Sequence, residues 1–160
     1  MKDWKEIIYP KFFVSLSKEL SLLRSKLSED VYKEGTSKYR GSQEEKISQL
    51  GMLAELIAQN YLTEQDKSYQ SAPLVDLSPV VGCDIEMEEY KIDVKGVKKE
   101  DNKLRVNYEA HTNLEKDISH YLFVQVISSS EARYKWFSVQ EVSRWKVIQS
   151  TYSKCFATDI

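Results

Sequence analysis

The sequence predicts a mixed α/β domain in which helices pack against a mixed β-sheet. Three observations lead to this fold class. Apolar and acidic residues alternate over residues 83–95, which indicates a β-hairpin. A continuous apolar run over 121–127 indicates a central buried strand. Apolar residues at helical spacing over 42–62 indicate a long amphipathic helix.

Length and composition fit one ordinary globular domain. The 160 residues can bury a sizeable core, so we expect a single domain over 1–160. A net charge of −2 argues against a protein that coats nucleic acid, although a local basic strip is compatible with it. Cys83 and Cys155 form no metal-binding spacing, which favours a reduced, cytoplasmic protein. No apolar stretch predicts a signal peptide or a membrane span.

The first predicted element is a helix from Trp4 to about Leu27, with Pro10 at the start of its regular part or at a kink. Its apolar stripe recurs at three- and four-residue steps and consists of Phe13, Leu16, Leu20, Leu23 and Leu27. The stripe could pack on the core of the domain or against a second subunit, and packing within the chain is favoured.

A polar loop containing Lys38 and Arg40 precedes the second predicted helix. These two side chains could contact a phosphate backbone, although a solvated loop is the default for such a segment. Ser42 and Glu45 form the S-x-x-E pattern of a capping box, which predicts a helix that begins there and ends near Leu62.

This second helix carries a wide apolar surface, so we expect it to be buried on much of its circumference. The apolar residues are Ile47, Leu50, Leu53, Ala54, Leu56, Ile57, Ala58 and Tyr61. Glu55 lies at the edge of this surface, beside Gly51. Glycine inside a helix costs about 1 kcal/mol relative to alanine. A small residue at this position would let the helix lie close to a sheet.

The hairpin is predicted to have one apolar and one polar face, because side chains two apart in a strand share a face. The apolar face takes Cys83, Ile85, Met87, Tyr90, Ile92 and Val94, and the polar face takes Asp84, Glu86, Lys91, Asp93 and Lys95. With a two-residue turn at 88–89, Glu86 would face Lys91 and Asp84 would face Asp93. This turn lacks the Asn-Gly chemistry that two-residue loops prefer.

The facing carboxylates of Asp84 and Asp93 are the first candidate site. Like charges directly opposite each other destabilise a hairpin, and Lys95 on the same face offsets this only in part. Two carboxylates beside a lysine supply the oxygen ligands and negative charge that a hard divalent cation needs. Asp76 is a rival for the first ligand, but Asp84 is preferred because it faces Asp93 across the hairpin.

The remaining predicted elements are a strand over 104–108, a helix over 113–119 capped by Asn113, the central strand over 121–127, a strand over 133–137 and a helix from 138 to about 145. Ser138 and Glu141 form a second capping box at the start of this last helix. From Gln149 onward the sequence shows little periodicity, and no element is predicted there.

At Asp84 and Asp93-Val94-Lys95 the sequence resembles the PD-(D/E)xK nuclease superfamily, which has the restriction-endonuclease-like fold. Cys83 stands where many members have the proline. The stretch 51–55 is similar to the first-helix motif of the superfamily, a glycine followed four residues later by the active-site glutamate. The predicted order from residue 42 is that of the αβββαβ core. The resemblance covers about 42–137, with an added N-terminal helix and an added C-terminal strand and helix.

The resemblance implies a metal-dependent DNA endonuclease of the restriction, resolvase or mobile-element type. Asp84 and Asp93 would bind Mg²⁺ or Mn²⁺ together with the Val94 carbonyl, and Glu55 would complete the shell directly or through water. Lys95 would lie near the attacking water, where its ammonium orients the water and stabilises negative charge.

The residues after the hairpin supply candidate DNA contacts. Lys98, Lys99, Lys103 and Arg105 would bind phosphates beside the metal centre, or else form a plain charged turn. We expect a homodimer, because one centre cuts one strand.

Two other functions stay open: a non-catalytic nucleic-acid-binding or regulatory module on the same fold, and a structural protein whose polar hairpin face is simply solvated. His111 and His120 lack zinc-like spacing and are expected to be solvated or satisfied in the core. Gln125 could face the site or a polar partner in the core.

Overall fold

The computed structural model describes residues 3–28, 44–65, 67–71, 83–113, 117–151 and 153–160. The strands are β1 (Lys5–Ile8), β2 (Gln70–Ser71), β3 (Ile85–Met87), β4 (Tyr90–Val97), β5 (Lys103–Asn107), β6 (His120–Val126), β7 (Glu131–Ser138), β8 (Lys146–Gln149) and β9 (Lys154–Asp159). The helices are α1 (Phe12–Ser28), α2 (Glu44–Glu64), α3 (Tyr108–Thr112) and α4 (Val139–Ser143). The predicted mixed α/β class is therefore confirmed. Among these elements, no helix is long and apolar enough to cross a bilayer.

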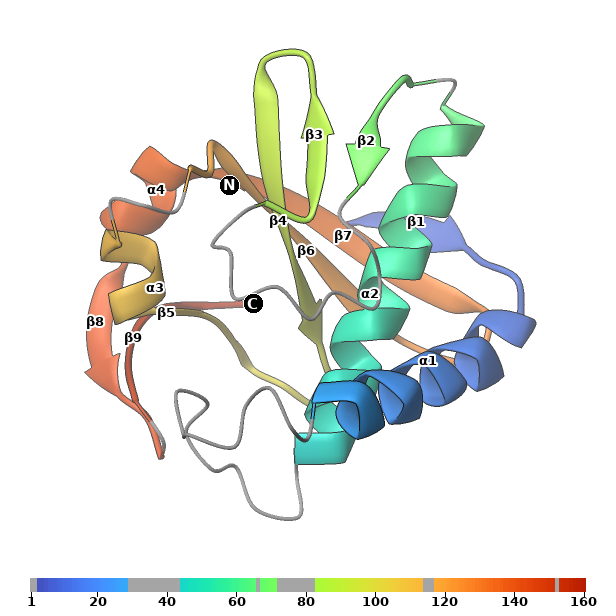
Figure 1. Cartoon of the computed structure of the whole chain (residues 1–160). Helices are drawn as coiled ribbons and strands as arrows, with labels where there is room; N and C mark the ends of the chain where they lie inside the picture. Colours follow the sequence, from blue (N-terminus) through green and yellow to red (C-terminus); the bar gives the residue numbers. More distant parts are fainter. Residues whose placement is uncertain (1–2, 29–43, 66, 72–82, 114–116, 152) are drawn as a thin grey trace.

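The strands form two sheets. A six-stranded mixed sheet has the order β1-β7-β6-β4-β3-β2, and a three-stranded antiparallel sheet has the order β5-β9-β8 (Figure 1). In the large sheet, β4 and β6 are parallel, whereas β3 and β7 run antiparallel to their neighbours.

The central strand β6 separates two hydrophobic cores. Leu122 and Val124 pack with α1 and α2 in one core, whereas Tyr121 and Phe123 pack with the small sheet and α4 in the other. Successive side chains of a strand point to opposite faces, so both faces of β6 are covered. This double burial explains the continuous apolar run from which the central strand was predicted.

The pairing predicted for the hairpin is confirmed for the three residues of β3, but the predicted pair of Asp84 with Asp93 is not part of the ladder. Ile85 pairs with Ile92, Glu86 with Lys91 and Met87 with Tyr90, around a two-residue turn. The first turn residue, Glu88, has a positive φ of 34°, a conformation that glycine or asparagine would adopt at lower cost. One boundary differs from the prediction: β3 begins at Ile85, so Asp84 lies immediately before the strand.

The N-terminal helix is shorter than predicted. Residues 5–8 instead form the edge strand β1, paired with β7, and the helix begins at Phe12. Proline disfavours helical backbone at the residue before it, and the β-branched Ile7 and Ile8 favour a strand.

The buried side of α1 also differs from the predicted apolar stripe. Ser17 and Ser21 are 0% and 2% exposed, whereas Leu23 is 44% exposed. Leu16 and Leu20 are only partly buried, and the side chain of Leu27 lies outside the described residues. The small serines therefore share the packed side of the helix with Phe13, and α1 packs against α2 of the same chain.

Two corrections concern the C-terminal half. The helix predicted over 113–119 is not formed at its described residues, 113 and 117–119, and a short helix lies earlier, at Tyr108–Thr112. Asn107 caps its N-terminus by accepting the Ala110 N–H at 3.0 Å, and Asn113 stands at its C-cap. The tail, for which no element was predicted, forms β8 and β9. β9 is the middle strand of the small sheet, where consecutive burial of residues 155–157 removes the expected alternation.

The capping box of Ser138 and Glu141 is confirmed at the start of α4, although that helix ends at Ser143, before Trp145. Ser42, Lys38, Arg40 and Asp76 lie outside the described residues.

The close approach of helix and sheet occurs at a different glycine from the one predicted. A Cβ atom added to Gly51 would meet no atom within 4 Å. A Cβ added to Gly96 of β4 would lie 2.9 Å from both the Leu50 Cγ and the Leu50 carbonyl oxygen. Gly96 is therefore the residue that lets α2 lie against β4.

This contrast gives a paired prediction. Gly51→Ala should raise the free energy of unfolding by about 1 kcal/mol, because alanine is the better helix former and the added methyl group has room. Gly96→Ala should lower it by about 1–3 kcal/mol, because the methyl group would press on the α2 backbone. Denaturant melts of both variants measure this, and a stabilised Gly96→Ala protein would contradict the close contact.

Candidate functional site

The candidate site lies at an edge of β4 that β3 leaves open. β3 pairs with only three residues of β4, Tyr90 to Ile92. Beyond them, the Asp84 backbone N–H donates to the Ile92 carbonyl at 2.9 Å, and the Asp84 Oδ2 accepts the Val94 N–H at 2.7 Å. The Asp84 side chain thus takes the place of a partner strand, and this fixes its carboxyl at the edge of β4.

The Val94 carbonyl shares this edge. In an antiparallel ladder a paired residue exchanges both its N–H and its C=O with the same neighbour, so the two groups point to one side of the strand. Because the Val94 N–H points to Asp84, the Val94 carbonyl also points toward the open edge.

Asp93 and Lys95 are held together one pleat apart on β4. The Lys95 Nζ lies 2.8 Å from the Asp93 Oδ2. Asp93 is 6% exposed, whereas the Lys95 side chain is 31% exposed. The Asp84 carboxyl hydrogen-bonds with Asp93 as well, so the buried carboxylate stands between a lysine and a second acid.

Glu55 approaches from α2, the helix that packs on β4 at Gly96. Burial raises the pKa of Glu55 to about 7. The Asp93 carboxylate adds to this rise in the pKa, and the cations of Arg24 and Lys95 oppose it. The Glu55 carboxyl therefore belongs to the same electrostatic cluster as the hairpin residues.

The pKa of Asp84 is raised further than that of Glu55. Burial, followed by the charges of Asp93 and Glu55, raises the pKa of Asp84 to about 8, while the Val94 N–H opposes the rise. The raised pKa values mean that, near neutral pH, Asp84 and Glu55 keep protons that ordinary surface acids would have released. Such a cluster favours a bound cation, which could replace these protons.

The structure thus brings together all four residues predicted for the site: Glu55, Asp84, Asp93 and Lys95. The carboxyls of the three acids are coupled electrostatically. However, no three acids, histidines or cysteines among the described residues are already spaced to hold a metal ion. A cation held here would therefore also need water or main-chain oxygen as ligands.

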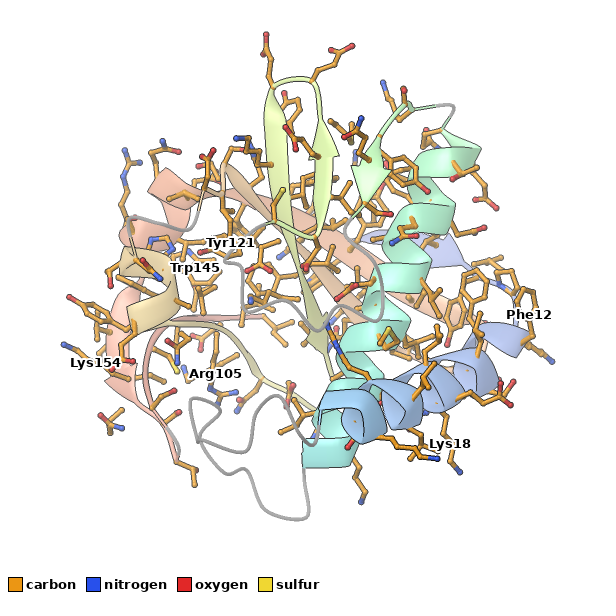
Figure 2. The ribbon with its side chains drawn as sticks, in the orientation of Figure 1. Phe12, Lys18, Arg105, Tyr121, Trp145 and Lys154 are labelled. Atoms are coloured by element: carbon orange, nitrogen blue, oxygen red, sulfur yellow. The ribbon has the colours of Figure 1, made fainter. Side chains whose placement is uncertain are left out.

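The predicted basic strip is divided between two places. The turn that carries Lys98 and Lys99 is anchored by Gln125, whose Nε2 donates to their carbonyl oxygens at 2.8 and 3.3 Å. Lys103 and Arg105 lie on β5 in the small sheet, where Lys103 pairs with Asp159 at 2.6 Å and Arg105 is exposed (Figure 2).

The side chain of Gln125 is a core partner and does not face the candidate site. It is 1% exposed, and its Oε1 accepts the Arg133 Nε–H at 2.6 Å. Gln125 therefore ties the end of β4 to β7.

Both histidines have hydrogen-bond partners. The His111 Nδ1 lies 2.7 Å from the Tyr121 hydroxyl, and its Nε2 lies 2.8 Å from the Ser143 Oγ. The His120 Nδ1 lies 3.0 Å from the Ser119 Oγ. These contacts agree with the expectation that the histidines are satisfied within the fold.

The sequence analysis missed two residues near the site. Arg24 interacts electrostatically with Glu55, and it lies three residues after the buried Ser21, hence on the packed side of α1. Tyr121 is the register partner of Asp93 on β6. Burial and then the Asp93 charge raise the pKa of Tyr121. The position of Arg24 could have been found from the serine spacing, whereas that of Tyr121 depends on the pairing of β4 with β6.

Comparison with protein-family models, curated proteins and solved structures gave no match to this chain.

The raised pKa values predict how the stability of the metal-free protein depends on pH. The unfolded chain releases these protons near pH 4, whereas the folded chain keeps them until the pH passes about 7 for Glu55 and about 8 for Asp84. Their contribution to stability is thus fully present below pH 4 and is lost as the pH rises through 8. Asp84→Asn should remove most of this loss.

Thermal melts in chelator between pH 5 and 9 test this expectation. The melting temperature of the wild type should fall relative to that of Asp84→Asn as the pH rises. Glu86→Gln is the matched control, because Glu86 is an exposed acid on the adjoining strand β3. Parallel curves for wild type and Asp84→Asn would show that Asp84 is an ordinary acid.

Proposed function

We propose that the protein is a metal-dependent DNA endonuclease that hydrolyses phosphodiester bonds with Mg²⁺ or Mn²⁺. The observation that carries this proposal is the convergence of Glu55 from α2 with Asp84, Asp93 and Lys95 at one open edge of β4. Phosphodiester hydrolysis needs a bound cation, a positioned water and positive charge near the phosphate. These side chains have the chemistry for all three requirements.

The metal ligands in this proposal are the carboxyls of Asp84 and Asp93 and the carbonyl of Val94. All three groups belong to the open edge or its adjoining hairpin. Glu55 completes the shell through water, in keeping with the spacing of the acids. Binding of the cation would displace the protons that the crowded carboxyls retain, so affinity should increase with pH.

Lys95 and Arg24 supply positive charge in this scheme. The 2.8 Å contact with Asp93 holds the Lys95 ammonium at the cluster, where it can orient the attacking water and stabilise the developing charge. Arg24 lies on the Glu55 side of the cluster and can neutralise a phosphate oxygen there.

The restriction-endonuclease-like core is part of the same proposal. The order α2, β2, β3, β4, β5, α3, β6 contains the αβββαβ order with the short strand β2 added, although β5 pairs in the small sheet. Lys98 and Lys99 are the proposed phosphate contacts on the turn after β4, with Lys103 and Arg105 farther along on β5. A homodimer would place one such centre on each DNA strand.

One observation favours a second candidate, a non-catalytic nucleic-acid-binding module on the same fold. Asp93 is already paired with Lys95, and the described acids are not spaced as a ready metal site. A retained but inactive cluster would have these features. The two predictions below separate the candidates.

The first prediction concerns metal binding. Mg²⁺ or Mn²⁺ should raise the melting temperature of the wild type, and the increase should be larger at pH 8 than at pH 6, because the metal competes with protons at Asp84 and Glu55. The double variant Asp84→Asn, Asp93→Asn should show no increase. Glu86→Gln should behave as the wild type, and equal increases in all three proteins would place the metal elsewhere.

The second prediction concerns catalysis. Lys95→Ala should reduce cleavage at least about a hundredfold, as expected when one preorganised donor to the transition state is removed. It should still show the thermal shift with Mg²⁺, because Lys95 is not a metal ligand. The matched control is Lys91→Ala, a lysine on the same strand that pairs with the exposed Asp117.

Cleavage is measured on duplex, nicked, four-way and single-stranded DNA. Retained cleavage in Lys95→Ala would move the catalytic role to another residue. Metal binding without cleavage of any substrate by the wild type would favour the non-catalytic module.

A further inference from the structure

A cavity of about 410 Å³ lies on the face of the large sheet that also carries α1 and α2. Its floor is a row of three residues on adjacent strands, Ile92 of β4, His120 of β6 and Ser138 of β7. Tyr90 of the hairpin and Glu141 of α4 also line the cavity. The cavity is thus formed where the hairpin and α4 flank the sheet.

Aromatic rings make up much of the lining. Tyr90 and His120 contact each other edge to face, with ring centroids 4.7 Å apart. Trp136, one pleat before Ser138 on β7, supplies a third ring. Tyr90 is 45% exposed, a large fraction for a tyrosine ring beside a cavity. Flat rings of this kind offer stacking surfaces to a planar ligand.

The charge of the lining is acidic. Glu141 is a carboxylate, and no lysine or arginine lines the cavity in the described part of the chain. Glu141 is held in place by the capping box, because its Oε2 accepts the Ser138 N–H at 2.7 Å and its own N–H donates to the Ser138 Oγ at 3.1 Å. A fixed carboxylate accepts hydrogen bonds but repels a phosphate.

We propose that this cavity binds a single nucleobase, stacked against the aromatic rings with its N–H donors directed to Glu141. The aromatic lining selects a planar ring, and the carboxylate selects a base with N–H and amino donors, such as guanine, over an anionic ligand. The fixed carboxylate of Glu141 repels a phosphate, so we expect the phosphate of a nucleotide to lie outside the cavity.

The base could come from a free nucleoside or from an unpaired nucleotide of a DNA strand. The second source rests on the proposed nuclease function. Tyr90 and Asp93 lie three residues apart on β4, which is about 10 Å along the strand. Ile92 and Asp93 point to opposite faces, so the cavity and the carboxyl cluster are separate sites on one strand.

Calorimetric titration in chelator tests the proposal without any metal. Guanosine should bind saturably to the wild type, and guanosine monophosphate should bind no more tightly. Tyr90→Ala should weaken guanosine binding about tenfold through loss of a stacking ring. Glu141→Gln should also weaken it about tenfold, although glutamine preserves the helix cap and the shape of the side chain.

Phe12→Ala is the matched control, because Phe12 is a 61% exposed aromatic residue at the start of α1 (Figure 2) and does not line the cavity. It should bind guanosine as the wild type does. Failure of the wild type to bind any nucleoside, or unchanged binding in both Tyr90→Ala and Glu141→Gln, would overturn the proposal.

A second measurement distinguishes the two sources. In chelator, a duplex with one unpaired guanine should bind more tightly than the fully paired duplex, and Tyr90→Ala should abolish the difference. Equal binding of both duplexes by a protein that binds guanosine would overturn the DNA source and leave a nucleoside site. Because metal is absent throughout, loss of metal-dependent cleavage cannot be mistaken for failure of this site.

Discussion

The candidate site depends on the packing of one helix against one strand at a glycine. Gly96 of β4 leaves room for the Leu50 main chain of α2, and a methyl group there would overlap with it. This contact sets the distance between α2 and β4, and Glu55 lies five residues beyond Leu50 on the helix. The packing of α2 on the sheet and the position of Glu55 beside the β4 edge therefore both depend on a residue without a side chain at position 96.

The same packing buries several carboxyl groups close together, which is electrostatically unfavourable. Asp84 and Asp93 were expected to repel each other across the hairpin. In the structure Lys95 pairs with Asp93, so the unfavourable charge falls on Asp84 and Glu55, the acids whose pKa values are raised. A purely structural cluster gains nothing from burying extra carboxyls, whereas a cation site needs them. This is the physical basis for preferring a metal-dependent function over a solvated or structural hairpin.

The hairpin and β4 also connect the two sites proposed for this protein. One face of β4 contributes Ile92 to the cavity beneath Tyr90, and the other contributes Asp93 to the carboxyl cluster. The alternation of side chains along a strand makes this possible, because neighbouring residues serve different faces. Because the short strand β3 begins only at Ile85, the edge of β4 is left accessible to the Asp84 side chain.

The sequence by itself determined the elements whose pattern is local. The hairpin pairing, the buried strand over 121–127, the capping box at Ser138 and the grouping of Asp84, Asp93 and Lys95 all follow from spacing within a few residues. Glu55 was included in the predicted site because residues 51–55 resemble a family motif. These features were predictable because strand alternation and helix capping depend only on neighbours along the chain.

Only the tertiary structure decided which segments pair at long range. The edge strand at 5–8 and the tail strands of the small sheet depend on partners far away in sequence, and burial of β9 on both sides removed its periodicity. The roles of Gly96, Gln125 and Tyr121 likewise come from contacts across strands and helices. Local pattern carries no information on such contacts, because the free energy that selects them comes from packing the whole core.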